Sequence, residues 1–342
     1  MHSLKREKLY EAQLNQATAL RNGSHTQQLD NEIYLAELAI VPDRNEKLIE
    51  EISVVAEMVK PLKLSADFIT LITSALAYNL GNTLTDAEFE TSRRMVEGLF
   101  KVDLRDVKWF PLEIKSRDYV EGTCHPVGDS AHFIYTQHDK HGVLSTDLLV
   151  HEMGHAADYT LSRLVNDDTL LVRHISLAET LAFYCQYKYL SEYGSQILRR
   201  GSIGAFIYTY LCIATMRYCL KNSISLQEMD VDIALDDVEF ESLIKSYESR
   251  DLDGRDFLSR TLKDRVKSYE NIQLMIHFEI SPRLGIVLSI LLLKKSPDVL
   301  KYISIENRIN TDLQNIVHKH LPDYYDVISD FETMAINYIN GK

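Results

Sequence analysis

The chain has 342 residues, 45% of them hydrophobic and 25% charged, which is an ordinary balance for a soluble folded protein. A chain of this length can bury a substantial core in one large domain or in two close lobes. The formal net charge of −13 argues against nucleic-acid binding, and no basic segment is interleaved with aromatic residues.

The sequence has no secretory or membrane-spanning pattern. Residues 1–7 lack the apolar stretch of a signal peptide, and the longest apolar run, 284–293, is about half of a bilayer span. We therefore expect no membrane span, and a location in the cytoplasm or export by a route that needs no N-terminal signal peptide. The four cysteines lack the paired spacing of zinc ribbons or redox motifs, so we expect reduced thiols.

The N-terminal third of the chain predicts helices. Apolar residues recur at helical spacing over 4–20, 46–60, 65–79 and 86–101, with breaks at 22–24, 41–43 and 81–82. We take residues 1–105 as an N-terminal helical region and 106–342 as the region that carries the chemistry. The two form one continuous domain with a cleft, or two parts on either side of it.

The pattern changes between residues 107 and 136. Segments 109–114 and 132–135 have the composition of short strands, and Gly122 and Gly128 are expected to form turns between them. The sequence therefore predicts a small sheet ahead of the next helix. The edge of such a sheet can bind an extended peptide as an additional strand.

The run His151-Glu152-Met153-Gly154-His155 is the most informative segment of the chain. Residues four apart lie on one face of a helix, so both imidazoles can reach the same metal ion. Glu152 lies about 100° round the helix, where it can hold a water molecule without ligating the metal. This pattern is typical of zinc peptidases. The alternative is that both histidines lie on a core helix and form hydrogen bonds within the protein, without binding a metal ion.

The residues around the motif predict one mostly buried helix. Apolar residues occupy 148–150 and continue to Leu164, so the helix is expected to run from Ser145 or Thr146 to about Leu164. Ser145 and Thr146 are both suitable N-caps. Gly154 costs about 1 kcal/mol in a helix interior, which indicates a packing or access reason for its presence.

A catalytic zinc site needs a third protein ligand and an open fourth position. Glu179, 24 residues after His155, is the only acid in the apolar helical stretch 176–184. A lone carboxylate on an apolar helix must be paired or must coordinate, because burying it bare is costly. We predict Glu179 as the third ligand. The alternative is an ion pair with Arg173 or Lys188.

These motifs resemble the thimet oligopeptidase and oligoendopeptidase F family, which has a gluzincin arrangement. Its members typically read His-Glu-x-Gly-His-Ala, here 151–156, with the third ligand on a helix similar to 176–179. An extended segment and a glycine ahead of the motif match 131–136 and Gly142. The strong likeness covers residues 130–190. It implies a mainly α, zincin-like fold with a small sheet beside the zinc helix, a deep cleft, and peptide cleavage by one Zn²⁺.

The chain also departs from that family, of which it has about half the usual length. Asp158 stands where many members have a further histidine, and it either orients a histidine ligand or lies on the helix surface. The family's transition-state donors, a histidine and several tyrosines, have no clean equivalent. Segment 276–285 resembles theirs, with His277 but without the tyrosines. We therefore consider His277, Tyr208 and Tyr210 as candidate oxyanion donors.

The rest of the chain is expected to be helical, near 202–221, 236–250, 255–279 and 283–303, with a further pair of helices at the C-terminus. His174 precedes the helix that carries Glu179. It either contacts the metal ligands from outside the coordination sphere or has no role in the site. Cys124 is expected in a loop near the motif, as a plain thiol or as a thiolate that caps zinc in a latent form.

The predicted function is a zinc-dependent peptidase. Zn²⁺ held by His151, His155 and Glu179 would activate a water molecule, whose proton Glu152 would take and pass to the leaving amine. The substrate is a peptide or a protein, and the short chain favours an open cleft with a narrow range of protein targets. One alternative is an inactive peptidase-like protein that binds a partner, and another is a scaffold without metal. The sequence does not predict the oligomeric state.

Overall fold

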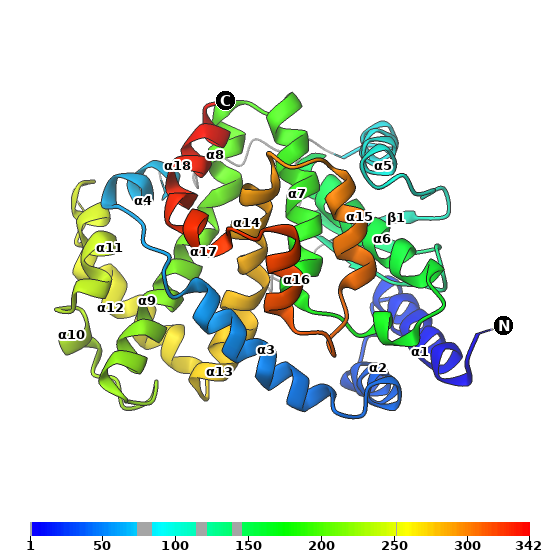
Figure 1. The fold of residues 1–342 in the computed structure, drawn as a ribbon, viewed down its shortest axis with the longest axis horizontal. Helices are drawn as coiled ribbons and strands as arrows, with labels where there is room; N and C mark the ends of the chain where they lie inside the picture. The colour runs from blue at the N-terminus through cyan, green and yellow to red at the C-terminus, as the bar shows by residue number, and fades with distance from the viewer. Residues whose placement is uncertain (1, 74–83, 114–121, 139–145, 251) are drawn as a thin grey trace.

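The computed structural model describes residues 2–73, 84–113, 122–138, 146–250 and 252–342 (Figure 1). Within these ranges the chain is mainly helical and contains one three-stranded sheet. The expected fold class is therefore confirmed. Gly142, Ser145, the break at 81–82, the end of the predicted strand at 114 and the second half of the predicted helix 65–79 lie outside the described residues.

The N-terminal region contains the four helices that the apolar spacing predicted, and one more. The helices are α1 (Leu4–Arg21), α2 (Gln27–Ile40), α3 (Arg44–Val59), α4 (Ala66–Thr73) and α5 (Asp86–Phe100). Helix α2 was not predicted. Ile40 is its only buried residue, because α2 packs over α1 at the edge of the molecule, and its apolar pattern is correspondingly weak (Figure 1).

The sheet contains β1 (Lys108–Glu113), β2 (Gly122–His125) and β3 (Phe133–His138) in the order β1-β3-β2. Strand β1 is parallel to β3, and β2 is antiparallel to it. The prediction of a turn at Gly122 was wrong, because Gly122 pairs with Thr136 and begins β2. Gly128 lies in the connection to β3 with a φ of +52°, a backbone conformation that glycine adopts without strain.

The motif lies on α6 (Thr146–Leu164), which is followed by η1 (Asp168–Leu171) and α7 (Ile175–Tyr193), as the sequence predicted. Helix α6 packs on α7, and α14 (Ser281–Leu292) packs on the other side of α7. Both contacts depend on a glycine. A Cβ atom on Gly154 would lie 2.8 Å from Cα of Ala182, and one on Gly285 would lie 2.7 Å from Cβ of Glu179. Close approach of two helices is thus the reason for Gly154.

Shorter helices than predicted complete the chain. They are α8 (Gln196–Gly204), α9 (Phe206–Asn222), α10 (Val231–Ala234), α11 (Val238–Glu248), α12 (Gly254–Asp264), η2 (Val266–Ser268), α13 (Ile272–Met275), the π-helical η3 (Ile276–Ile280), α15 (Asp298–Glu306), α16 (Leu313–His320), α17 (Tyr324–Val327), η4 (Ile328–Asp330) and α18 (Phe331–Ile339). The expected helix 255–279 is interrupted after Asp264. The expected helix 283–303 stops at Leu292, shortly before Pro297, which cannot donate a helical backbone hydrogen bond.

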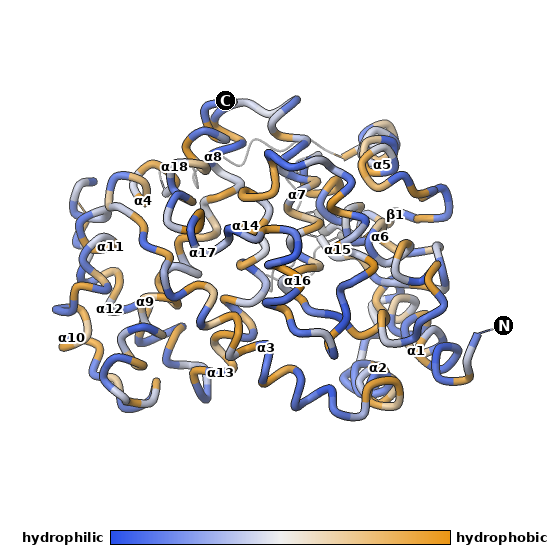
Figure 2. The backbone as a smooth tube through the Cα atoms, viewed as in Figure 1, coloured by the Kyte–Doolittle hydropathy of each residue, from blue (hydrophilic) through white to orange (hydrophobic). Residues whose placement is uncertain are grey.

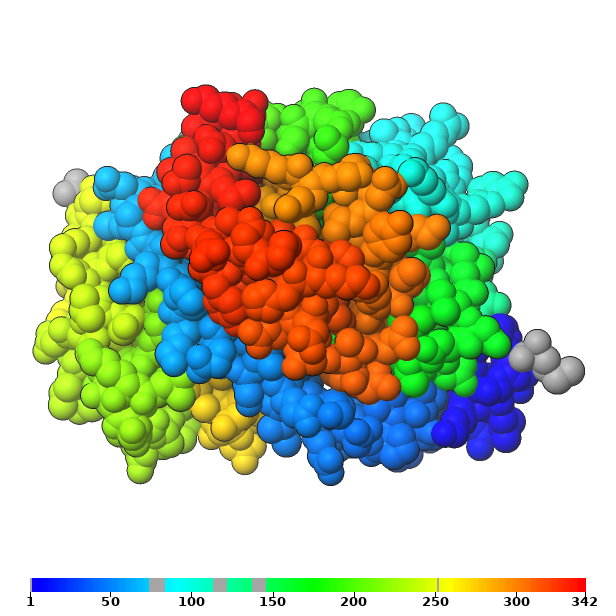
Figure 3. Space-filling view, viewed as in Figure 1, coloured from blue at the N-terminus to red at the C-terminus, as the bar shows by residue number. Residues whose placement is uncertain are grey.

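Helices α7 and α14 run through the middle of the molecule, and α15 to α18 cover them on the face seen in Figure 3. Outer helices such as α2 and α5 alternate hydrophobic and hydrophilic residues along the chain, as Figure 2 shows. Two described stretches, Gln196–Asn222 and Ile272–Leu292, are long and apolar enough to cross a membrane. The most apolar windows of these stretches are 83% and 72% buried inside the protein, which is also a property of core helices.

Candidate metal centre

The three predicted ligands converge between α6 and α7. Nε2 of His151 lies 3.5 Å from Oε2 of Glu179, and Nε2 of His155 lies 3.6 Å from Oε1 of Glu179. The ligand atoms of the three residues all lie within 4.8 Å of one another. Ligand atoms about 2.1 Å from a tetrahedral zinc ion are separated by about 3.4 Å. The observed spacing therefore fits a single ion.

Aromatic rings beside the histidines restrict their orientation. The His151 ring packs edge-on against Phe183 of α7, with the centroids 4.6 Å apart. The His155 ring stacks on Tyr159, one turn further along α6, with the centroids 6.4 Å apart. Each imidazole thus presents its Nε2 atom toward Glu179 while its sides are covered by protein.

The surroundings of the cluster exclude the ion pairs that were the alternative for Glu179. Arg173 instead pairs with Asp158 at 2.5 Å, and Lys188 pairs with Glu192 at 3.2 Å. The two histidine side chains are 12% exposed and the Glu179 side chain is 22% exposed. The ligand atoms therefore belong to a partly open site and are not buried in a closed core.

The electrostatics favour metal ligation at Glu179 and His155, whereas the pKa of His151 is raised because the charges of Glu179 and Glu152 outweigh the effect of burial. Burial alone would raise the pKa of Glu179, but His155 and His151 outweigh this effect and lower it. Burial lowers the pKa of His155 to about 4, with the carboxylate of Glu179 opposing the shift. An ionised carboxylate and a neutral imidazole are the protonation states that bind metal ions.

Glu152 is buried on the side of α6 that faces the sheet. A Cβ atom on Gly122 would lie 3.1 Å from Oε1 of Glu152, so glycine gives the carboxyl group its space. Burial raises the pKa of Glu152 to about 7, while His151 and a backbone hydrogen bond from Cys124 act in the opposite direction. A carboxyl group with this pKa can accept and release a proton near neutral pH.

Cys124 belongs to β2 and not to the loop that the sequence predicted. It is buried, and its pKa is raised well above the usual value by burial and by the nearby charge of Glu152. The group of potential metal ligands found among the described residues does not include it. Cys124 is thus a protonated thiol at neutral pH, which argues against a capping thiolate.

The structure does not bring the two candidate oxyanion tyrosines into contact with the metal ligands among the described residues. The hydroxyl group of Tyr210 is buried and accepts a hydrogen bond from the backbone N–H of Leu64 at 3.0 Å, so it is committed to a core contact. Tyr208 is half-buried under the guanidinium group of Arg265, 4.6 Å from its ring centroid. No described contact joins either tyrosine to the three ligands.

His277 lies on η3, which packs against α3. Burial lowers its pKa, with Glu51 of α3 acting against the shift and Arg44 reinforcing it. Its described charged neighbours thus belong to α3 and not to the metal cluster. Its Nδ1 atom is buried without a hydrogen-bond partner among the described residues.

Asp158 and His174 have structural partners. Asp158 is fully buried and binds Arg173, so it neither orients a histidine ligand nor lies on the helix surface. Nδ1 of His174 lies 3.2 Å from Oε2 of Glu51, and its Nε2 atom lies 2.7 Å from the carbonyl oxygen of Thr311. These contacts tie α7 to α3 and to the segment before α16.

Two residues at the site were not predicted. Gln186 contributes to the raised pKa of His151, and its amide nitrogen donates to Asp147 at 2.7 Å. Arg283 lies two residues before Gly285, where α14 contacts Glu179, and its charge contributes to the lowered pKa of Glu179. Arg283 is half-buried, and no hydrogen bond or ion pair holds it within the described part of the chain. As the one cation in the apolar helix 281–292, it was visible in the sequence.

Comparison with known proteins gives one distant likeness. No protein-family model and no curated protein matches the chain. A solved structure of PZ peptidase A with inhibitor 2 is similar over 92% of this chain and 64% of that chain, with a TM-score of 0.48 and 13% sequence identity. The chain thus spans less than two thirds of that structure. A likeness at this level carries no argument about the chemistry of the site.

Proposed function

We propose that the chain is a zinc-dependent peptidase. The observation that carries the proposal is the convergence of His151, His155 and Glu179 on one position, with Glu152 buried beside it. Zinc fits this set because two imidazoles and one carboxylate leave a fourth coordination position free for a reactant. A bound zinc ion would supply Lewis-acid activation of water and of the scissile carbonyl group.

Glu152 performs the proton transfers in this proposal. Its carboxylate accepts the proton of the attacking water as the oxygen bonds to the carbonyl carbon. It then delivers that proton to the amine nitrogen as the C–N bond breaks, so the carboxylate is regenerated. A pKa near 7 serves both steps, because the group is neither too weak a base nor too weak an acid at neutral pH.

Two further features of the site support binding of a peptide. Among the described residues, strand β2 lies at an edge of the sheet, and it lies directly against Glu152, so an extended peptide added to this edge would pass beside the general base. Arg283 offers a cation on the side of Glu179 that no described residue pairs with, and we assign it the stabilisation of the developing oxyanion in place of the missing tyrosines.

Metal content and cleavage test the proposal together. Wild-type protein, Glu179→Ala and Glu152→Gln are dialysed with zinc, analysed for bound metal and incubated with a random peptide library. The control is Glu192→Ala, which removes an exposed acid from the same helix. We expect about one zinc per chain in wild type, Glu152→Gln and the control, and much less in Glu179→Ala. Cleavage should fall about 10²- to 10⁴-fold in Glu152→Gln.

The outcomes separate this function from its alternatives. No zinc in the reconstituted wild type would leave a scaffold without metal. Zinc binding without cleavage of the library or of candidate proteins would favour an inactive relative that binds a partner. Cleavage by Glu152→Gln at the wild-type rate would refute the role of Glu152.

A further inference from the structure

A cavity of about 300 Å³ lies next to the metal centre, between α1, α2, α6 and the N-terminus of α7. Tyr159 and Ala178 are the lining residues next to the centre, because Tyr159 stacks on His155 and Ala178 precedes Glu179. Gln13 and Gln16 of α1 and Arg163 of α6 also line the cavity.

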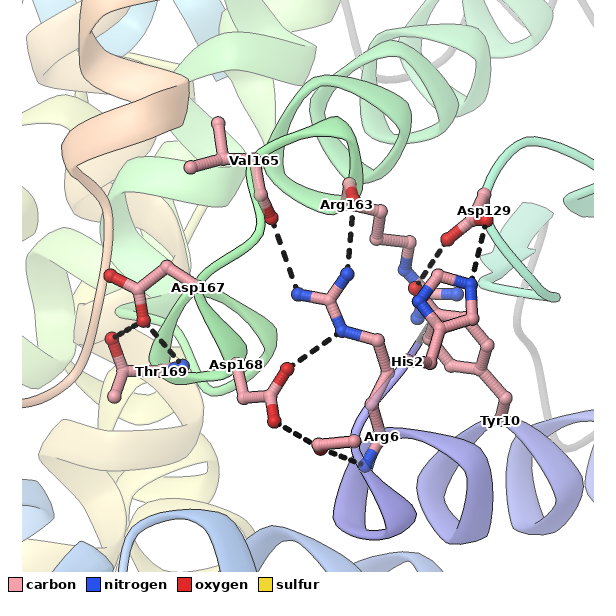
Figure 4. Close-up of polar contacts among 10 residues, drawn as sticks. His2, Arg6, Tyr10, Asp129, Arg163, Val165, Asp167, Asp168 and Thr169 are labelled. Carbon is pink, nitrogen blue, oxygen red and sulfur yellow. Dashed lines mark hydrogen bonds and ion pairs between the residues drawn. The ribbon is translucent and has the colours of Figure 1, made fainter.

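Arg163 is a buried cation that forms no ion pair with the described part of the chain. It is 4% exposed, and no described carboxylate lies within ion-pair distance of its guanidinium group. Its hydrogen bonds go to neutral acceptors, the carbonyl of Gly128 and the side chain of Gln13, and its Nε atom has no partner. Figure 4 shows its side chain extending toward Tyr10, whose ring lies 4.6 Å from Cζ of Arg163.

The charges around Arg163 do not neutralise it. Asp129 is its nearest acid, and this carboxylate is already bound by His2 and by the hydroxyl of Tyr10 (Figure 4). The acid among the residues that line the cavity, Glu37, pairs with Arg44 at 2.9 Å. Burial accordingly lowers the pKa of Arg163 to about 10. A buried charge of this kind is stabilised when an anion enters beside it.

The cavity also lies at a fixed distance from the position where a peptide bond would be cleaved. His155, Tyr159 and Arg163 follow one another at four-residue intervals on the same face of α6. Eight residues of helix extend about 12 Å, and an extended peptide covers this length in about three to four residues. An anionic group of a peptide bound at the centre would therefore reach Arg163 if it lay this far from the scissile bond.

We propose that this cavity is a substrate subsite that binds a carboxylate of the peptide, three to four residues from the bond that is cleaved. The carboxylate is an acidic side chain or the free C-terminus of the substrate, and it replaces Gln13 as the acceptor of Arg163. This inference rests on the proposed peptidase function for its substrate class, but the binding that it requires can be measured without cleavage.

The test uses the zinc-loaded Glu152→Gln protein and a pool of synthetic octapeptides. Each sequence is present with Glu or with Gln at one position, and with a free or an amidated C-terminus. Peptides that co-elute with the protein are quantified by mass spectrometry. We expect the carboxylate-bearing member to be retained at least about tenfold better in one of the two kinds of matched pair, because a charge-assisted hydrogen bond is gained. The Glu/Gln and acid/amide pairs distinguish the two sources of the carboxylate.

Variants of Arg163 establish which residue is responsible. Arg163→Gln in the same background should abolish the preference, and Arg163→Lys should retain it, since the lysine keeps the charge. Arg217→Gln is the matched control, because Arg217 is also a buried arginine but does not line the cavity. Equal retention of acidic and neutral peptides, or a preference that survives Arg163→Gln, would overturn the subsite.

The peptidase function and the subsite can fail separately. Wild-type protein that cleaves peptides without regard to carboxylates overturns the subsite and supports the function. A preference for carboxylates that depends on Arg163, in a protein that cleaves nothing, supports the subsite and contradicts the function.

Discussion

Two histidine–carboxylate groups lie within one and a half turns of each other at the start of α7, and they differ in how completely the protein encloses them. His174 and Glu51 are 2% and 1% exposed, and the ring of His174 contacts Glu51 through one nitrogen and Thr311 through the other. His151 and His155 have Glu179 as the partner of their Nε2 atoms, and the group is partly open. The same residue types thus form a closed structural pair in one place and a set of free ligand atoms in the other.

The comparison shows that a histidine near a carboxylate is not in itself a metal site. What distinguishes the two groups is the number of atoms that the fold leaves available. In the closed pair, each ring nitrogen already faces a protein oxygen. In the open group, three ligand atoms face a common position, so a cation can satisfy them all at once.

The largest expected difference between the two groups is in metal binding. His155→Ala should reduce bound zinc from about one ion per chain to nearly none, because two protein ligands do not hold zinc in a structural or catalytic site. His174→Ala should retain the metal. Elemental analysis after dialysis measures both, and zinc loss from His174→Ala with retention in His155→Ala would reverse the assignment.

The second expected difference is in stability. Glu51→Gln should lower the free energy of unfolding by about 3 kcal/mol, because it breaks a buried pair and leaves its partner uncompensated. Glu50→Gln, at the neighbouring exposed position, is the control and should change stability by less than about 0.5 kcal/mol. Urea denaturation measures both variants. If Glu51→Gln were as stable as the control, the pair would not support the fold.

Substitution of Arg283 tests whether this residue acts together with the three ligands and Glu152. Arg283→Gln should lower kcat/KM by about 10²-fold while the zinc content stays unchanged, as expected for the loss of one oxyanion donor. Arg283→Lys should recover part of the activity because it keeps the charge. The control is Arg265→Gln, an exposed cation over Tyr208. An unchanged kcat/KM in Arg283→Gln would restrict the open group to the three ligands and Glu152.

Substitution of Gly154, at the contact between α6 and α7, tests whether the open group depends on close packing of these helices. Gly154→Ala should destabilise the protein by about 1–2 kcal/mol, because the added methyl group meets the backbone of Ala182. Gly98→Ala on α5 adds the same methyl group where nothing lies within 4 Å, and it should stabilise the protein by up to about 1 kcal/mol. Thermal unfolding compares the two, and equal shifts would indicate that the helices can separate freely.

A second closed histidine, His132, is expected to affect stability only at acidic pH. Burial lowers the pKa of His132 well below its usual value, and its Nδ1 atom accepts a hydrogen bond from the backbone N–H of Val127. Below about pH 6.5 the unfolded chain therefore binds a proton that the folded chain does not, so stability falls as the pH falls. The expected slope is about 1.4 kcal/mol per pH unit, measured by urea denaturation. In His132→Asn this slope should be smaller by that amount; an unchanged slope would contradict the assignment.

The sequence predicted the elements whose residues follow a short-range pattern. Helices α6 and α7, with the three ligands on them, follow from apolar spacing and from the four-residue interval between the histidines. The strand at Gly122 did not follow, because its pairing with β3 and its contact with Glu152 join residues that are distant in the chain. The position of Arg283 depends in the same way on where α14 crosses α7, which no local pattern encodes.

The capping of α6 has a consequence for the order in which the chain can fold. Arg6 of α1 pairs with Asp168 and donates hydrogen bonds to the carbonyl oxygens of Arg163 and Val165, at the C-terminal end of α6 (Figure 4). During synthesis on the ribosome, α1 emerges more than a hundred residues before these acceptors exist. Arg6 of the first helix therefore has none of these acceptors until the motif helix and the segment after it have been made. The end of that helix, in turn, is completed only by a segment that was translated long before it.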